Sequence, residues 1–158
     1  QDVIPPVDVI EQLLSHQEKV VTGVYYKYFN LQYQHQGKKV KTVKQLMPLL
    51  FGYVPGITTK MRFLSQQDVE APAFFPVRFC GLGCVLIQRD VLEKVKFRAD
   101  TSVNCHDDLW FCNDALQNGF KIYVDTNVKC KHMLSGKPSG LFADAQKGFN
   151  PEALTASP

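Results

Sequence analysis

Two adjacent carboxylates, Asp107 and Asp108, open an apolar helical pattern, and His132 follows at the end of a strand-like run. The spacing places Asp108 on one helix face with Phe111, Cys112 and Ala115, so the carboxylate lies at the end of a face that packs on a sheet. Helix N-termini stabilise anions, and an ionised carboxylate in a partly dry cleft can act as a general base. Simple helix capping is the alternative, because Asp is also a preferred N-cap residue.

A second group of residues could bind a metal ion. Asp2 stands at the end of a short strand-like run, just before Pro5 and Pro6, and His132 ends another. A carboxylate and an imidazole at strand ends suit Mn²⁺ or Mg²⁺, which prefers oxygen ligands and completes its shell with phosphate oxygens. We therefore predict that Asp2 and His132 lie within about 6 Å of each other. A lone Asp or His is more often structural, so each residue is a weak signal alone.

The segment CGLGC, residues 80–84, contains two glycines that allow a backbone to approach a ligand closely. It is not a dinucleotide-binding fingerprint, because Leu86 stands where the third glycine of GxGxxG would be.

The elements that must position these residues alternate along the chain. Residues 7–17 predict a short helix with Val7, Ile10 and Leu14 on one face. Residues 19–29 predict a strand, and the segment after it predicts a hairpin turning near Gly37. Residues 48–76 contain many prolines and glycines and predict a long irregular connection.

The second half of the chain predicts strands on both sides of the glycine turn, followed by a helix over 89–95. A further helix over 107–118 ends at Gly119, and two strands follow over 120–125 and 127–132. Interleaved strands and helices indicate an α/β fold with a mixed sheet. Residues 133–158 lack periodicity and predict a flexible tail or flap, so 1–132 form the folded portion.

The composition fits one globular domain: 158 residues, 45% hydrophobic and 21% charged, with a net charge of +3. This charge gives no argument for nucleic acid. The chain has no apolar run of membrane-spanning length and no signal peptide, which favours a cytoplasmic protein and leaves peripheral membrane contact open. The five cysteines are irregularly spaced and favour buried thiols over a zinc site.

The order of these features resembles the carboxyl-terminal two-thirds of an inverting GT-A fold glycosyltransferase of the family-2 type. QDVIPP is similar to the end of the DxD motif of that family, and FCGLGCVLIQRDVLEKVKF to its glycine-containing strand. The acidic pair at a helix start and the late histidine follow in the same order. The resemblance spans Asp2 to His132, so we expect the amino-terminal nucleotide-binding strands of such a domain to be missing from this chain.

The resemblance implies a role for each matched residue. Asp108 would be the base that deprotonates the acceptor hydroxyl, with Asp107 positioning the acceptor beside it. Asp2 would hold the metal and donor diphosphate, and His132 would be a further metal ligand. Gly81 and Gly83 would back the donor sugar. The partners implied are a nucleotide-diphosphate sugar and a glycan, lipid or protein acceptor.

Two other classes of function remain open. A non-catalytic carbohydrate- or partner-binding module could use aromatic residues as stacking platforms, namely Tyr25, Tyr26, Tyr28, Phe74, Phe75 and Trp110. A metal-dependent hydrolase of nucleotide sugars or other phosphate compounds would also need acids and a divalent cation. The products formed from a nucleotide sugar distinguish these classes.

Overall fold

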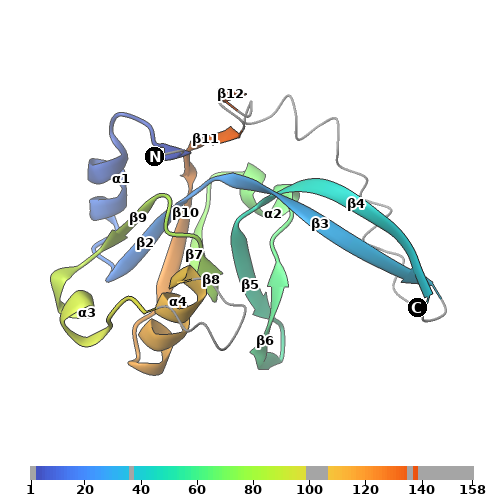
Figure 1. Cartoon of the computed structure of the whole chain (residues 1–158). Coiled ribbons are helices and arrows are strands. Elements are labelled where there is room, and N and C mark those ends of the chain that lie inside the picture. Colours follow the sequence, from blue (N-terminus) through green and yellow to red (C-terminus); the bar gives the residue numbers. More distant parts are fainter. Residues whose placement is uncertain (1–2, 36–37, 99–106, 135–136, 139–158) are drawn as a thin grey trace.

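The computed structural model describes residues 3–35, 38–98, 107–134 and 137–138 of the chain. Its centre is a four-stranded mixed sheet in the order β7-β10-β2-β9 (Figure 1). The strands are β2 (Val20–Val24), β7 (Phe74–Val77), β9 (Val85–Ile87) and β10 (Ile122–Lys129). β10 runs parallel to β2, and the two outer strands are antiparallel to their neighbours. The expected α/β class with a mixed sheet is confirmed.

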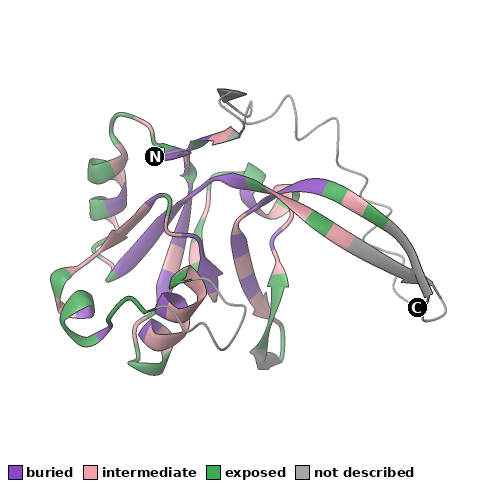
Figure 2. Ribbon diagram, in the orientation of Figure 1, coloured by how far each residue is buried: buried purple, intermediate pink, exposed green. Residues whose placement is uncertain are grey.

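Helices cover both faces of this sheet. Successive side chains of β2 point to opposite faces, so β2 contributes apolar residues to both. Val20 and Val24 pack in the apolar cluster that contains Phe111 of α4 (Asp107–Gln117). Val21 packs in a second cluster with Leu13 of α1 (Val9–Ser15). The buried residues of Figure 2 run through β2 and β10, between these two helices.

A long β-ribbon leaves the central sheet after β2. β3 (Tyr26–His35) and β4 (Lys38–Pro48) pair along their length, and the ribbon extends away from the rest of the molecule (Figure 1). This confirms the predicted hairpin; Gly37 lies outside the described residues. The ribbon matters for function because its base, at Tyr26 and Lys27, borders the candidate site described below.

The predicted irregular connection over 48–76 is wrong. The segment forms β5 (Leu50–Val54), β6 (Ile57–Phe63) and α2 (Gln66–Glu70), and β5 also pairs with β8 (Phe79–Cys80). Pro55 and Gly56 make the turn between β5 and β6, with Gly56 at a φ of 74°, the conformation that a type II turn needs from glycine. Pro76 lies in β7, an edge strand, where a missing N–H is tolerated.

The face predicted for the first helix is also wrong. Val7, Ile10 and Leu14 are exposed, and Leu13 packs against the sheet instead. By contrast, α4 follows its prediction: Phe111, Cys112 and Ala115 are buried, and Gly119 ends the helix with a φ of 82°. α3 (Arg89–Lys94) matches the predicted helix over 89–95.

A small sheet closes the top of the molecule in Figure 1, in the order β1-β11-β12. It contains β1 (Val3–Ile4), β11 (Lys131–Leu134) and β12 (Lys137–Pro138). β11 thus continues two residues past the predicted end of the folded portion at residue 132. Most of the predicted tail, residues 139–158, lies outside the described residues. None of the helices in the described part of the chain is long and apolar enough to cross a bilayer.

Candidate functional site

One pocket of about 370 Å³ gathers residues that are far apart in the sequence. Its wall comes from β1, the junction of β2 and β3, the loop between β8 and β9, the start of α4, and β11. The lining residues are Val3, Tyr25, Lys27, Leu82, Gly83, Asp107, Asp108 and His132. Both predicted acids, one predicted glycine and the predicted histidine therefore face the same space.

The side chain of His132 is buried and is held in a defined orientation. Its Nδ1 lies 2.6 Å from the carbonyl oxygen of Tyr26, and its ring meets the Tyr25 ring edge to face with centroids 5.5 Å apart. A carbonyl oxygen can only accept, so Nδ1 carries the hydrogen, and in a neutral ring the lone pair is on Nε2. A backbone carbonyl that fixes the tautomer in this way is the usual support of a metal-binding histidine.

The position of Asp2 is not described, but its neighbour in sequence is. Val3 lies directly opposite His132 in the antiparallel pair of β1 and β11, and it lines the pocket. The predicted distance between Asp2 and His132 therefore stays a prediction.

Both acids lie in the first turn of α4, as predicted. An Asp107 carboxylate oxygen accepts from the Asp108 N–H at 3.0 Å, and an Asp108 oxygen accepts from the Leu109 N–H at 2.8 Å. Asp107 is exposed and Asp108 is half-buried. A carboxylate offers about four acceptor positions, so it can accept more than one hydrogen bond at a time.

Tyr25 packs against the glycine loop and leaves no room for a side chain at Gly81 or Gly83. The Gly83 N–H donates to the Tyr25 hydroxyl at 3.1 Å. A Cβ on Gly81 would lie 2.0 Å from that hydroxyl oxygen, and a Cβ on Gly83 would lie 2.7 Å from Cγ2 of Val3. Gly83 lines the pocket, whereas Gly81 is buried beside Tyr25 and Leu49 and is not among the lining residues.

Buried thiols connect this loop to the elements that carry the acids and the histidine. Cys80 lies 4.0 Å from Cys112 of α4, sulfur to sulfur, and Cys84 is hydrogen-bonded to Cys130, two residues before His132. The hydrogen bond from Cys130 lowers the pKa of Cys84, and the same contact raises that of Cys130. These four described cysteines are free thiols; Cys105 lies outside the described residues.

The sequence analysis missed Lys27 as a candidate and did not predict the supporting role of Tyr25. Lys27 lines the same pocket as both acids, from β3, and is the one lysine or arginine in its described wall. Tyr25 supports both His132 and Gly83. The sequence signal for Lys27 is its isolation, since it is the single charged residue in the run VVTGVYYKYF.

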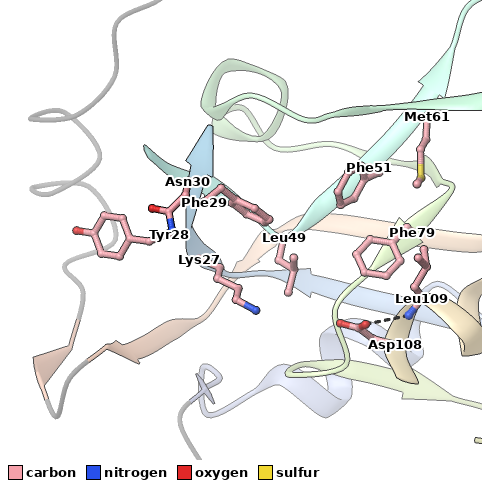
Figure 3. Close-up of a pocket in the computed structure, with 10 residues that line it drawn as sticks. All are labelled: Lys27, Tyr28, Phe29, Asn30, Leu49, Phe51, Met61, Phe79, Asp108 and Leu109. Carbon is pink, nitrogen blue, oxygen red and sulfur yellow. Dashed lines mark hydrogen bonds between the residues drawn. The ribbon is translucent and has the colours of Figure 1, made fainter. Parts of the chain in front are cut away.

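A second pocket, of about 350 Å³, shares Asp108 and Lys27 with the first (Figure 3). Its remaining wall is mainly apolar and comes from Tyr28, Phe29, Asn30, Leu49, Phe51, Met61, Phe79 and Leu109. Asp108 and Lys27 thus border both pockets, so a group at Asp108 can be reached from either pocket.

The residues present partly fit a divalent cation. The imidazole of His132 has the supporting contact of a metal ligand, and two carboxylates line the same pocket. Within the described part of the chain, however, no three His, Cys, Asp or Glu side chains are close enough together to hold an ion. A cation at His132 therefore needs Asp2 or substrate oxygens to complete its shell.

Comparisons with known proteins assign no family to this chain. No protein-family model and no curated protein matches the chain. Nine chains of solved structures match it, among them the crystal structure of A197 from STIV. That similarity has a TM-score of 0.48 at 20% sequence identity and covers 85% of this chain. It covers 55% of the A197 chain, so this chain spans about half the length of that protein.

Proposed function

We propose that this chain is the acceptor-side portion of a GT-A-like, inverting glycosyltransferase that uses a nucleotide-diphosphate sugar. One observation carries the proposal: residues that the resemblance matches to base, metal and donor roles line a single pocket. Asp107, Asp108, Gly83 and His132 come from three separate segments, and Val3 brings the end of the DxD-like segment to the same pocket.

The reaction would be a single displacement at the anomeric carbon of the donor sugar. Asp108 takes the proton of the acceptor hydroxyl while the acceptor oxygen bonds to the anomeric carbon. The bond from that carbon to the diphosphate oxygen breaks at the same time, and its electron pair leaves with the nucleoside diphosphate. Attack from the face opposite the leaving group inverts the configuration.

The other pocket residues would position the two substrates. Asp107 would orient the acceptor beside Asp108, and the ammonium of Lys27, which lines the same pocket, would pair with the donor diphosphate. His132 and Asp2 would hold a divalent cation, Mn²⁺ or Mg²⁺, which when bound supplies positive charge to the departing diphosphate. Gly83 provides a stretch of pocket wall without a side chain, because a side chain there would collide with Val3 and Tyr25.

The proposal is tested by nucleotide binding and by product analysis with the full chain. Calorimetric titration with UDP and GDP should show binding that requires Mn²⁺ and disappears with EDTA. Incubation with uridine or guanosine diphosphate sugars should then give a glycosylated product with inverted configuration. Binding that ignores the metal would contradict the proposed metal site, and release of free sugar alone would identify a hydrolase.

A further inference from the structure

The second pocket, here called the apolar pocket, has the wall of a site for an apolar compound. Phe51 meets Phe79 edge to face, with ring centroids 5.0 Å apart, and Leu49, Met61 and Leu109 complete this part of the wall. Figure 3 shows these side chains gathered around the space, with Tyr28 pointing away from them. An aromatic or aliphatic ligand would extend contacts that the protein already makes.

The charged groups of the apolar pocket are the two that it shares with the first pocket, while Asn30 and the Tyr28 hydroxyl are its other polar groups. The shared groups are Asp108 and the ammonium end of Lys27 (Figure 3). A ligand with one hydroxyl can place that group at Asp108 and leave its body against the phenylalanines. A sugar ring carries several hydroxyls, and those facing Phe51, Phe79 and Leu49 would lose water without gaining a partner.

The volume indicates the size of the part of the ligand that the pocket holds. Water occupies about 30 Å³ per molecule in the liquid, so about 350 Å³ accommodates roughly a dozen nonhydrogen atoms. This is the size of a bicyclic aromatic alcohol or of an alkyl alcohol with about ten carbons.

We propose that the apolar pocket binds the body of a small, hydroxylated apolar compound whose hydroxyl hydrogen-bonds to Asp108. The inference rests on the proposed function, under which this compound is the sugar acceptor. Its hydroxyl proton passes to Asp108, its oxygen bonds to the anomeric carbon, and the nucleoside diphosphate departs with the electron pair of the broken bond. The acceptor is thereby an apolar alcohol and not a saccharide.

The direct test is binding of 2-naphthol, followed by its fluorescence, with Met61→Gln as the variant. Met61 is 42% exposed at the edge of the apolar pocket, so the substitution changes the wall and spares the core. Leu14→Gln is the matched control, because Leu14 is 52% exposed on α1 and lines neither pocket. We expect saturable binding, weakened about tenfold by Met61→Gln and unchanged by Leu14→Gln. Methyl glucoside should not compete.

The place of the hydroxyl is tested with 2-methoxynaphthalene, which cannot donate a hydrogen bond. It should bind the unmodified chain about tenfold more weakly than 2-naphthol, and Asp108→Ala should abolish this difference. Three results would overturn the inference: no saturable binding, equal losses in Met61→Gln and Leu14→Gln, or competition by methyl glucoside. A preference for 2-naphthol that survives in Asp108→Ala would do the same.

Measuring nucleotide binding distinguishes a failure of the acceptor inference from a failure of the proposed glycosyltransferase function. If UDP or GDP binds with Mn²⁺ while 2-naphthol fails, the acceptor inference is wrong and the proposed function stands. If 2-naphthol binds as expected and no nucleoside diphosphate binds with metal, the apolar pocket is a site for alcohols and the proposed function fails.

Discussion

Nδ1 of His132 lies 2.6 Å from the carbonyl oxygen of Tyr26, the first residue of the β-ribbon, across 106 positions of sequence. This hydrogen bond fixes the imidazole against the backbone and leaves Nε2 as the nitrogen with acceptor character in the neutral ring. The ring belongs to β11, whose partner strand β1 places Val3 opposite His132. The hydrogen bond therefore fixes the orientation of the imidazole next to the segment that contains Asp2.

His132→Gln should weaken Mn²⁺-dependent binding of UDP or GDP at least tenfold, since loss even of a supporting contact costs about 10–100-fold in metal affinity. Glutamine keeps a donor for the Tyr26 carbonyl and removes the aromatic nitrogen. Calorimetry at fixed nucleotide and varied Mn²⁺ measures the effect. His16→Gln is the control, because His16 pairs with Asp125 outside the pocket. Equal losses in both variants would assign His132 a purely structural role.

Asp108→Asn should reduce glycosyl transfer by about 10²–10⁴-fold, the usual contribution of a general base, while nucleotide binding is retained. The amide keeps an oxygen that can accept from the Leu109 N–H, so the start of α4 should remain intact. Single-turnover rates with a saturating donor measure the chemical step.

Asp107→Asn is the matched comparison, since it changes the neighbouring acid in the same helical turn. We expect a rise in the KM of the acceptor and a small effect on the chemical step. If Asp107→Asn abolishes transfer and Asp108→Asn is mild, the roles of the two acids are reversed. If both variants only lower the melting temperature, the acids are helix caps.

Local signals in the sequence predicted the parts of the site that depend on one element. The face of α4 follows from the spacing of Phe111, Cys112 and Ala115, and Gly119 marks its end. The β3–β4 ribbon follows from a β-branched run on both sides of a glycine turn. These elements are short-range, so the pattern alone specifies them.

Features that depend on packing between distant segments were not predicted. α1 is short, and its position on the sheet buries Leu13 while Ile10 and Leu14 remain exposed. The β5–β6 hairpin was missed because its Pro55-Gly56 turn was interpreted as part of an irregular segment. Lys27 reaches the pocket only because β3 passes α4 and β11, and nothing near it in sequence specifies that approach.

Lys27→Gln should weaken nucleoside diphosphate binding about tenfold, because charge-assisted hydrogen bonds to phosphate are stronger than neutral ones. The loss should shrink as salt increases, since salt screens a partly exposed ion pair. Titration at low and high NaCl measures both effects. Lys96→Gln is the control, as Lys96 is exposed and lines neither pocket. A salt-independent loss would show that Lys27 acts through packing.

Tyr26→Phe should stabilise the protein. Tyr26 is 2% exposed, and within the described residues its hydroxyl has no hydrogen-bond partner. Removing an unpaired buried hydroxyl should raise the free energy of unfolding by about 1 kcal/mol at neutral pH. Urea denaturation measures the change, with Tyr53→Phe as the control because Tyr53 is only partly buried in β5.

The stabilising effect of Tyr26→Phe should increase at high pH. Burial, helped by the negative charge of Glu70, raises the pKa of Tyr26 to about 12. Because the pKa is higher in the folded state than the unfolded value, near 10, ionisation of Tyr26 favours the unfolded chain. The free energy of unfolding is therefore unaffected by this group below about pH 10 and falls as the pH rises from about 10 to about 12. Phenylalanine does not ionise, so the advantage of Tyr26→Phe over the unmodified protein should grow across this range, by about 2 kcal/mol at its upper end. An advantage that stays constant from pH 8 to pH 11.5 would show that Tyr26 ionises equally well in the folded and unfolded chain.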